Sequence, residues 1–248
     1  MSMSIIYYMR ASLNKMSTPT ELHAVLFDLD GTLIDTAPDF AIAVNQLRQQ
    51  NNRDPLPFQS IRETVSQGSK ALITLAFQRQ EGDHGFEDLR QQLLDLYSRH
   101  LAVETALFPG ISDLLAWLEQ RRIPWGIVTN KPRRYAEPIL SFLDLNQRCS
   151  TLVCPDDVSN TKPHPEPMFL ACDQIACIPE NTIYVGDHRR DIEAGTNAAM
   201  TTIAANYGYI ERHDPTVNWN ADFYVDHAQE IQPLLQANFL LPPNTDRR

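Results

Sequence analysis

Short, almost wholly apolar runs rich in β-branched and aromatic residues alternate with helical patterns along most of this chain. The strand-like runs occupy residues 24–27, 125–128, 151–154, 182–185, 201–204 and 223–225. The helical patterns occupy residues 111–121, 132–143, 165–176, 189–199 and 228–237. Strands that helices cover on both faces are apolar on both sides, so this alternation predicts an α/β fold with a doubly wound, Rossmann-like parallel sheet.

One long interval interrupts the alternation, because no strand-like run is apparent between residues 27 and 125. Residues 37–107 have helical periodicity instead, and Thr36-Ala37-Pro38-Asp39 resembles a capping box with an early proline. Apolar stripes at helical spacing follow, namely Phe40, Ala43, Val44 and Leu47; Leu72, Ile73, Ala76 and Phe77; and Phe86, Leu89, Leu93, Leu96, Tyr97 and His100. We therefore predict a helical unit inserted after the first strand.

These patterns predict the division of the chain. We expect a flexible leader at 1–20, a core formed by 21–36 and 108–240, the helical unit at 37–107 and a tail at 241–248. The apolar run of the leader, from Ile5 to Met9, is too short for a signal peptide or a membrane span, and translation could begin at Met1, Met9 or Met16. No other stretch reaches the roughly twenty apolar residues that a bilayer requires, so we expect no membrane contact.

Charge and cysteine spacing restrict the partners. Lys and Arg number 21 against 31 Asp and Glu, which gives a net charge of −10 and argues against nucleic acid or anionic lipid as a partner. A small anionic substrate would need a local cation or a metal. The cysteines lie in two pairs whose spacing is wider than that of zinc sites, so we expect structural thiols and a reducing cytoplasm: Cys149 and Cys154, and Cys172 and Cys177.

Two aspartates follow the first strand directly. Residues i and i+2 of an extended segment point the same way, so Asp28 and Asp30 begin on one face, and Gly31 lets the chain turn away. Two carboxylates this close repel each other, which favours either a bound hard cation or one protonated carboxyl group.

Polar groups also follow two later strands and fill one loop between prolines. Thr129 and Asn130 precede a helix, where a hydroxyl and backbone N–H groups suit a phosphate, although Thr129 could instead cap that helix. Lys162 lies in a rigid proline-flanked loop, where a solvated surface role is the alternative. Asp187 and Asp191 are four residues apart at a helix start, which suits a metal cluster, and capping by Asp187 is the alternative.

Together these segments resemble the motifs of the haloacid dehalogenase superfamily of phosphatases. The ordered motifs are Phe27-Asp28-Leu29-Asp30-Gly31-Thr32, Val128-Thr129-Asn130, Lys162-Pro163 and Val185-Gly186-Asp187-His188-Arg189-Arg190-Asp191. The resemblance covers about residues 23–237, and the helical insert looks like the mobile cap of this superfamily. Within it, the chain most resembles the phosphoglycolate phosphatase type. The stretches 125–140, 154–172 and 207–210 look particularly like the branch acting on N-acetylmuramic acid 6-phosphate.

The resemblance implies a covalent, magnesium-dependent hydrolysis of a small phosphorylated metabolite. Asp28 would attack phosphorus, and Asp30 would give a proton to the leaving group and later activate water. Lys162 would stabilise charge on the phosphoryl group, and Thr129 and the Asn130 N–H would hold its oxygens. The implied ligands of Mg²⁺ are the Asp28 carboxylate, the Asp30 backbone carbonyl and Asp187, with Asp191 ordering its waters.

Other positions leave alternatives open. Ser69 and Lys70, between two helical segments, either contact the substrate or simply begin a helix. Two residues depart from the family pattern. His188 stands where a small or acidic residue is expected, and Ala199 replaces a glycine at a cost of up to about 1 kcal/mol if that backbone needs positive φ.

Two other functions compete with hydrolysis. A phosphomutase would use the same groups but return the phosphate to a sugar, and a non-catalytic sensor would only bind a phosphorylated ligand. A haloacid dehalogenase fits poorly, because that chemistry needs neither Asp30 nor a metal. The sequence predicts no oligomeric state.

Overall fold

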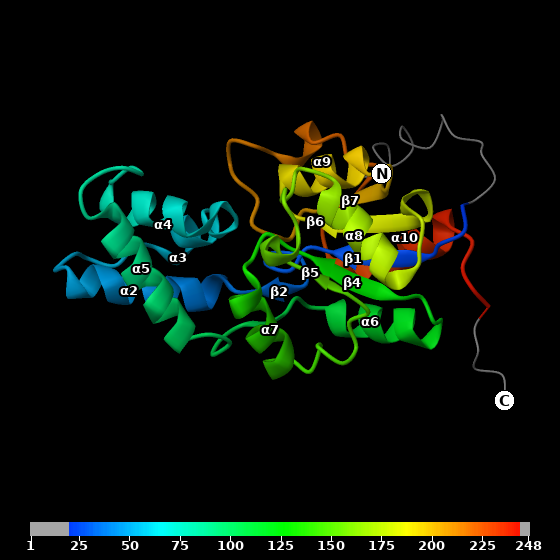
Figure 1. Ribbon diagram of the computed structural model, residues 1–248, viewed down its shortest axis with the longest axis horizontal. Coiled ribbons are helices and arrows are strands. Elements are labelled where there is room, and N and C mark those ends of the chain that lie inside the picture. Colours follow the sequence, from blue (N-terminus) through cyan, green and yellow to red (C-terminus); the bar gives the residue numbers. More distant parts are fainter. Residues whose placement is uncertain (1–19, 244–248) are drawn as a thin grey trace, which may run out of the picture.

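A computed structural model of the protein describes residues 20–243 and contains a six-stranded sheet (Figure 1). The strands lie in the order β5-β4-β1-β6-β7-β8, and every neighbouring pair is parallel. Their bounds are β1 Ala24–Phe27, β4 Trp125–Val128, β5 Leu152–Val153, β6 Thr182–Gly186, β7 Thr201–Ala205 and β8 Phe223–Val225. The predicted α/β class with a parallel, doubly wound sheet is confirmed.

Helices cover both faces of this sheet (Figure 1). The bounds on one face are α6 Ile111–Gln120, α7 Arg133–Phe142 and α10 Ile231–Asn238, and on the other α8 Glu166–Ile175 and α9 Arg189–Asn197. Side chains of β1 alternate between the two layers, because Val25 and Phe27 belong to the apolar cluster of α6 and α7 whereas Leu26 belongs to that of α8 and α9. Burial on both faces explains why β1 is apolar throughout.

The strand order places the site. From β1 the chain goes to β4 and β5 on one side of the sheet and then returns to β6 on the other side of β1. Loops that leave β4 and β6 therefore diverge on either side of β1 and open a crevice at the carboxyl ends of these strands.

The remaining helices form a separate group at one end of the molecule (Figure 1). Their bounds are α2 Ala37–Gln50, α3 Phe58–Arg62, α4 Gly68–Phe77 and α5 Phe86–Arg99. These helices span residues 37–99 and lie within the interval 37–107 expected for the helical unit. The stripes expected from the sequence are buried in α2, α4 and α5, except that His100 is half-buried and lies 3.0 Å from the Gln46 Oε1 atom.

Two short strands connect the helical unit to the core, so the expectation of no strand before residue 125 is wrong. Ile34–Asp35 (β2) pairs antiparallel with Ala106–Leu107 (β3). Each strand has only two residues, which is too short for an alternating pattern, and its partner lies far away in the sequence. The two strands hold the entry and exit segments of the helical unit side by side.

The expected capping box at the start of α2 is also wrong. The Thr36 hydroxyl donates to the Asp30 Oδ1 atom at 2.6 Å, and the Asp39 carboxylate accepts from the Thr105 hydroxyl at 2.6 Å. Both side chains thus bond to other segments rather than to the helix start. The backbone N–H of Thr36 donates instead to the Tyr209 hydroxyl at 2.7 Å, so a residue from the loop after β7 satisfies this end of α2.

The structure bears on two other expectations, which concern the cysteines and a membrane span. All cysteines are free thiols, and burial raises the pKa of Cys149 to about 11. Within residues 20–243, no helix has both the length and the apolar character to cross a membrane. The expected leader and tail fall largely outside these residues.

Candidate active site

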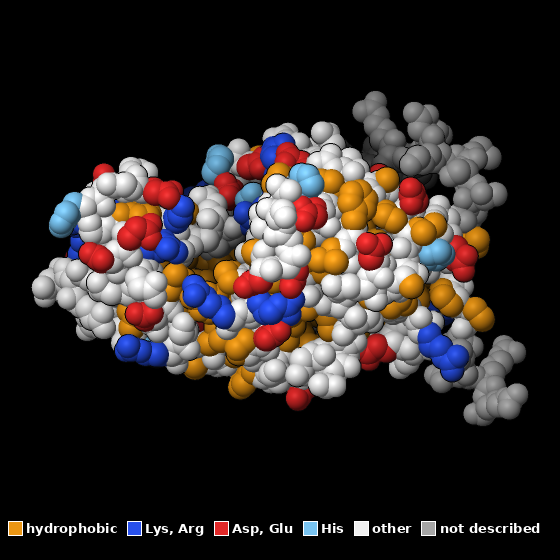
Figure 2. Space-filling model, in the orientation of Figure 1, with side chains coloured by type: hydrophobic (Ala, Val, Ile, Leu, Met, Phe, Trp, Pro, Cys, Tyr) orange, Lys and Arg blue, Asp and Glu red, His pale blue; other side chains and the backbone are white. Residues whose placement is uncertain are grey.

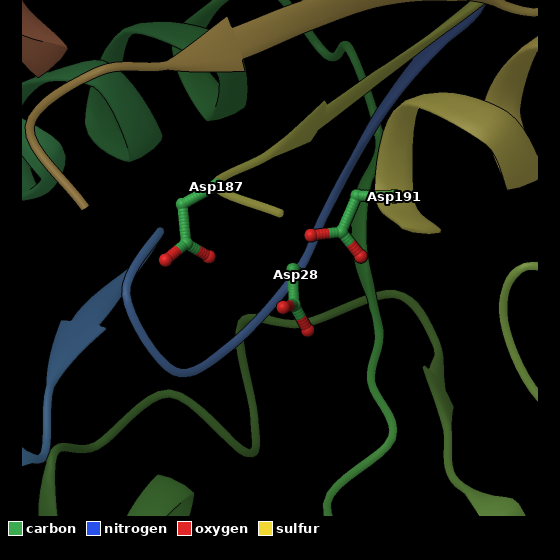
Figure 3. A group of neighbouring side chains, drawn as sticks. All are labelled: Asp28, Asp187 and Asp191. Atoms are coloured by element: carbon green, nitrogen blue, oxygen red, sulfur yellow. The ribbon is translucent and has the colours of Figure 1, made fainter. Parts of the chain in front are cut away.

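Three carboxylates meet at the carboxyl ends of β1 and β6. Asp28 follows β1, Asp187 follows β6, and Asp191 lies in the first turn of α9. One oxygen from each lies within 4.8 Å of the others, and all three side chains are buried. Figure 3 shows the three side chains converging from these separate segments. We call Asp28, Asp187 and Asp191 the carboxylate cluster.

Two glycines allow backbone to approach the Asp187 side chain closely. A Cβ atom at Gly31, where φ is +85°, would lie 2.0 Å from the Asp187 Oδ2 atom, and a Cβ at Gly208 would lie 2.2 Å from the Asp187 Cβ. The carboxylate of Asp187 accepts hydrogen bonds from the Thr32 hydroxyl at 3.1 Å and the Tyr209 N–H at 2.8 Å. Loops after β1 and β7 therefore fix its orientation.

Lys162 provides a cation within the cluster, so the alternative of a solvated surface lysine is wrong. Its Nζ atom lies 2.9 Å from Asp28 Oδ1 and 2.8 Å from Asp191 Oδ1, and the residue is 3% exposed. The ammonium also donates to the Tyr184 hydroxyl at 2.8 Å. The Asn130 amide holds the loop, since it donates to the Lys162 carbonyl at 3.0 Å and accepts from its N–H at 3.2 Å.

Among the described residues, the three buried carboxylates of the cluster outnumber the single lysine that contacts them. Burial, with the neighbouring charges of Asp28 and Asp191, raises the pKa of Asp187 to about 8. Burial also raises the pKa of Asp191, although Lys162 opposes this rise. The Oδ1 atoms of Asp28 and Asp191 contact Lys162 as ion pairs but accept no well-directed hydrogen bond from the described residues. Converging oxygens with spare lone pairs fit a hard divalent cation such as Mg²⁺.

The raised pKa of Asp187 predicts how stability depends on pH without metal. Between pH about 4 and about 8 the folded protein keeps a proton that the unfolded chain releases, because the pKa rises from 3.8 to about 8 on folding. The free energy of unfolding in EDTA should therefore fall as pH rises through this range. Urea unfolding at pH 5, 6.5 and 8 measures it. Asp187→Asn should flatten the slope, and equal slopes in both proteins would contradict the prediction.

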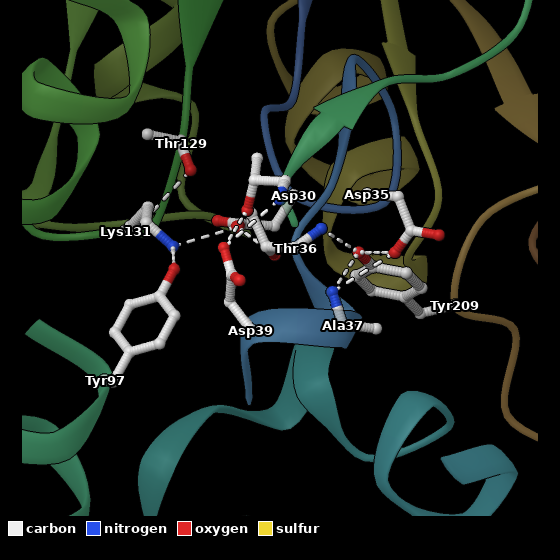
Figure 4. Close-up of polar contacts among 10 residues, drawn as sticks. Asp30, Asp35, Thr36, Ala37, Asp39, Tyr97, Thr129, Lys131 and Tyr209 are labelled. Carbon is white, nitrogen blue, oxygen red and sulfur yellow. Dashed lines mark hydrogen bonds and ion pairs between the residues drawn. The ribbon is translucent and has the colours of Figure 1, made fainter. Parts of the chain in front are cut away.

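The Asp30 side chain has partners outside the carboxylate cluster. Its Oδ1 atom accepts from the Thr36 hydroxyl at 2.6 Å and lies 2.9 Å from the Lys131 Nζ atom (Figure 4). The Asp30 side chain is 18% exposed, unlike the buried Asp28 two residues earlier. The two aspartates thus occupy different environments, with Asp28 in the cluster and Asp30 on the side of the helical unit.

Thr129 does not cap the following helix. The residue that precedes α7 is Pro132, and the buried Thr129 hydroxyl accepts from the Lys131 N–H at 3.1 Å (Figure 4). Its own N–H donates to the Val153 carbonyl at 3.0 Å, which places Thr129 at the end of β4. The hydroxyl therefore lies at the edge of the sheet where the crevice opens.

Ser69 and Lys70 lie in the first turn of α4, which begins at Gly68. The Lys70 ammonium pairs with Glu81, and its side chain is 54% exposed. The structure therefore gives Lys70 a partner within the helical unit and brings neither residue into the carboxylate cluster.

The two departures from the family pattern lie at the two ends of α9. His188, rather than Asp187, caps α9, since its ring accepts from the Arg190 N–H at 3.3 Å and its own N–H donates to Asp191 Oδ2 at 3.0 Å. Burial lowers the pKa of His188. Ala199 has a φ of 61°, so it carries the strain that glycine would avoid.

Contacts between the helical unit and the core were not apparent from the sequence. Arg62 of α3 donates to the Gly208 carbonyl at 2.8 Å and stacks over the Tyr209 ring at 4.8 Å. Arg190 of α9 donates to the Ser66 carbonyl. The surface is hollowed where the helical unit meets the core, and both basic and acidic side chains lie beside this hollow (Figure 2).

Comparisons with known proteins agree with this arrangement. Residues 25–205 match the family model of haloacid dehalogenase-like hydrolases. The chain is 44% identical over 214 residues to an N-acetylmuramic acid 6-phosphate phosphatase of Pseudomonas aeruginosa, covering 86% of this chain and 95% of that protein. It is 38% identical over 208 residues to a phosphoglycolate phosphatase of Xanthomonas campestris, covering 84% and 94%.

A solved structure shares the fold. The crystal structure of a predicted phosphoglycolate phosphatase from Haemophilus somnus superposes with a TM-score of 0.78 at 24% identity, covering 90% of this chain and 100% of that one. The family model spans most of the parallel sheet, the carboxylate cluster and Lys162, and relatives match along nearly their whole length. This chain belongs to the family of haloacid dehalogenase-like hydrolases.

Proposed function

We propose that this protein is a Mg²⁺-dependent phosphatase that hydrolyses a small phosphorylated metabolite through an aspartyl-phosphate. One observation carries the proposal: a buried carboxylate cluster that shares a lysine lies at the carboxyl ends of β1 and β6. Such a site combines a nucleophilic carboxylate with positions for cations beside it. The phosphatase relatives support this function.

The residues present suit a magnesium ion. The Asp28 and Asp187 carboxylates and the Asp30 backbone carbonyl would hold it, and Asp191 would order its waters. When bound, Mg²⁺ would offset the negative charge of the phosphate and of the attacking carboxylate. The net charge of −10 repels a phosphorylated substrate at long range. A Mg²⁺ ion held by the carboxylate cluster would supply the local positive charge that such an anion needs.

The first chemical step joins the substrate to the enzyme. A carboxylate oxygen of Asp28 attacks phosphorus in line, the bond from phosphorus to the ester oxygen breaks, and the leaving alkoxide takes a proton from Asp30. Lys162, which contacts Asp28, stabilises the phosphoryl charge. The Thr129 hydroxyl and the Asn130 N–H hold the phosphoryl oxygens.

The second step releases phosphate and restores the enzyme. Asp30, now ionised, takes a proton from a water molecule as that water attacks phosphorus. The bond from phosphorus to the Asp28 oxygen breaks, and inorganic phosphate leaves. Asp30 is protonated again and Asp28 is again a free carboxylate, so the cycle closes.

We propose that the helical insert, residues 37–107, is a cap over this site. Several contacts join this insert to the core beside the site, namely those of Arg62 and Arg190 and the ion pair between Arg212 and Glu63. These contacts support a role of the insert in excluding water and in recognising the leaving group. Ser69 and Lys70 stay predictions as contacts of the leaving group, and Lys70 would have to leave Glu81 to make one.

We propose N-acetylmuramic acid 6-phosphate as the substrate, with phosphoglycolate as the alternative. The chain is 44% identical to the N-acetylmuramic acid 6-phosphate phosphatase but 38% identical to the phosphoglycolate phosphatase. Both compounds carry a carboxylate besides the phosphate, so a cation placed beside the leaving group would recognise either one.

A panel of phosphorylated metabolites compared by kcat/KM tests the proposal. We expect N-acetylmuramic acid 6-phosphate to exceed N-acetylglucosamine 6-phosphate by at least about tenfold, because the latter lacks the lactyl carboxylate that a cation would recognise. Phosphoglycolate is compared in the same panel. Phosphate released to water separates hydrolysis from the transfer to a sugar that a phosphomutase would catalyse. No phosphate release from any ester with Mg²⁺ present would refute the phosphatase and favour a sensor.

A further inference from the structure

Lys131 is a buried lysine at the boundary between the core and the helical unit. It lies in the loop after β4, and its side chain is 6% exposed. The ammonium lies 2.9 Å from the Asp30 Oδ1 atom and donates to the Tyr97 hydroxyl at 2.8 Å (Figure 4). The rings of Tyr97 and Phe40 stack on each other with centroids 3.9 Å apart, and they lie beside the ammonium at 4.9 Å and 5.3 Å.

These contacts are what a buried cation needs. A charged lysine removed from water requires an opposite charge and further polar contacts, and Asp30 and Tyr97 supply them. The two rings add cation–π attraction. Burial raises the pKa of Tyr97 to about 12, so its phenol is neutral and accepts through a lone pair. Lys131 is therefore held in one place by groups from α2, α5 and the loop after β1.

The consequence falls on the two oxygens of Asp30. Oδ1 is engaged twice, by the Lys131 ammonium and by the Thr36 hydroxyl at 2.6 Å. Oδ2 accepts no hydrogen bond from any residue between 20 and 243, and the side chain is partly exposed. Two donors directed at Oδ1 leave no room for a proton on that oxygen, so a proton on this carboxyl group sits on Oδ2.

We propose that Lys131 is a positioning residue that, with Tyr97, anchors Oδ1 of Asp30 so that Oδ2 carries the proton to the leaving oxygen. Lys131 acts through Asp30 and does not itself touch the substrate. This inference rests on the proposed phosphatase function and deepens it, because it makes proton delivery in the core depend on a tyrosine of the helical unit.

The leaving group of the substrate separates positioning from a structural role. p-Nitrophenolate leaves without protonation, whereas an alkoxide needs the proton of Asp30. The value of kcat/KM reports the steps up to cleavage of the ester bond, so the later hydrolysis, which also uses Asp30, does not enter. The ratio of kcat/KM for N-acetylmuramic acid 6-phosphate to that for p-nitrophenyl phosphate therefore measures proton delivery.

We expect Lys131→Met to lower this ratio by about tenfold to a hundredfold, because a well-placed general acid contributes roughly 10² or more. Tyr97→Phe, which keeps the ring and removes the hydroxyl, should lower it in the same direction by a smaller factor. Lys131→Arg keeps the charge and should restore part of the ratio. Tyr135→Phe is the matched control, because its ring lies 5.8 Å from that of Tyr97, and it should leave the ratio unchanged.

The outcomes are distinguishable. Equal losses on both esters in Lys131→Met and Tyr97→Phe would overturn the proposal, since they indicate a structural role, and so would unchanged ratios. Should Lys131→Met fail to fold, the milder Tyr97→Phe decides by itself. A wild-type protein that hydrolyses neither ester would instead refute the phosphatase function.

Discussion

Asp28→Asn should abolish turnover while the protein stays folded. With saturating Mg²⁺ we expect kcat for p-nitrophenyl phosphate to fall by roughly 10⁴-fold or more, because removal of a covalent nucleophile costs losses of this order. An asparagine amide has nearly the shape of the carboxylate but carries no negative charge for attack on phosphorus. Initial rates of phosphate release measure the loss.

The stability of Asp28→Asn distinguishes lost chemistry from lost structure. Asp28 repels Asp187 and Asp191, so its neutralisation should leave the melting temperature in EDTA unchanged or higher. Asp113→Asn, an exposed change on α6, is the matched control and should keep full activity. Full activity of Asp28→Asn with saturating Mg²⁺ would refute the covalent route.

Removal of divalent metal should have an effect of comparable size. After dialysis against EDTA, we expect hydrolysis of p-nitrophenyl phosphate to fall by roughly 10³-fold or more, because the carboxylate cluster would then repel the phosphate and the contact with Lys162 offsets only part of its charge. Added Mg²⁺ should restore the rate and raise the melting temperature. Both effects are measured on one preparation by titrating the ion back.

A variant of one proposed ligand makes this test specific. Asp187→Asn should need a higher Mg²⁺ concentration for half-maximal activity, whereas Asp113→Asn should not. A rate that EDTA leaves unchanged in the dialysed wild-type protein would show that hydrolysis needs no metal.

The core of the fold could be predicted because its strands are buried on both faces. β1, β4 and β6 are short apolar runs, and each alternates with a helix, so local pattern and tertiary structure agree. The pairing of β2 with β3 could not be predicted, because two-residue strands have no measurable period. The start of α2 could not be predicted for a related reason, since Thr36 and Asp39 bond to other segments that the sequence pattern does not bring together.

Some residues of the candidate site could likewise be predicted from the sequence, and others could not. Asp28 and Asp187 could be chosen from the sequence because strands of a parallel sheet deliver their carboxyl ends to one edge, whereas Lys162 could be expected there only from the resemblance to the family motifs. The partners of Asp30 could not, because the contact of Lys131 with Tyr97 depends on how α5 packs against the core. Nothing around Lys131 in the sequence indicates that its side chain is buried.

Direct capture of the phosphorylated enzyme tests the central claim most directly. Protein quenched during turnover of p-nitrophenyl phosphate and reduced with borohydride should contain homoserine at position 28, because the reagent reduces an acyl phosphate but not a free carboxylate. Peptide mass spectrometry locates the change. We expect it at Asp28 in the wild-type protein, in a substrate-dependent manner, and at no other aspartate. Active wild-type protein whose position 28 stays aspartate, or carries homoserine without substrate, would contradict the aspartyl-phosphate route.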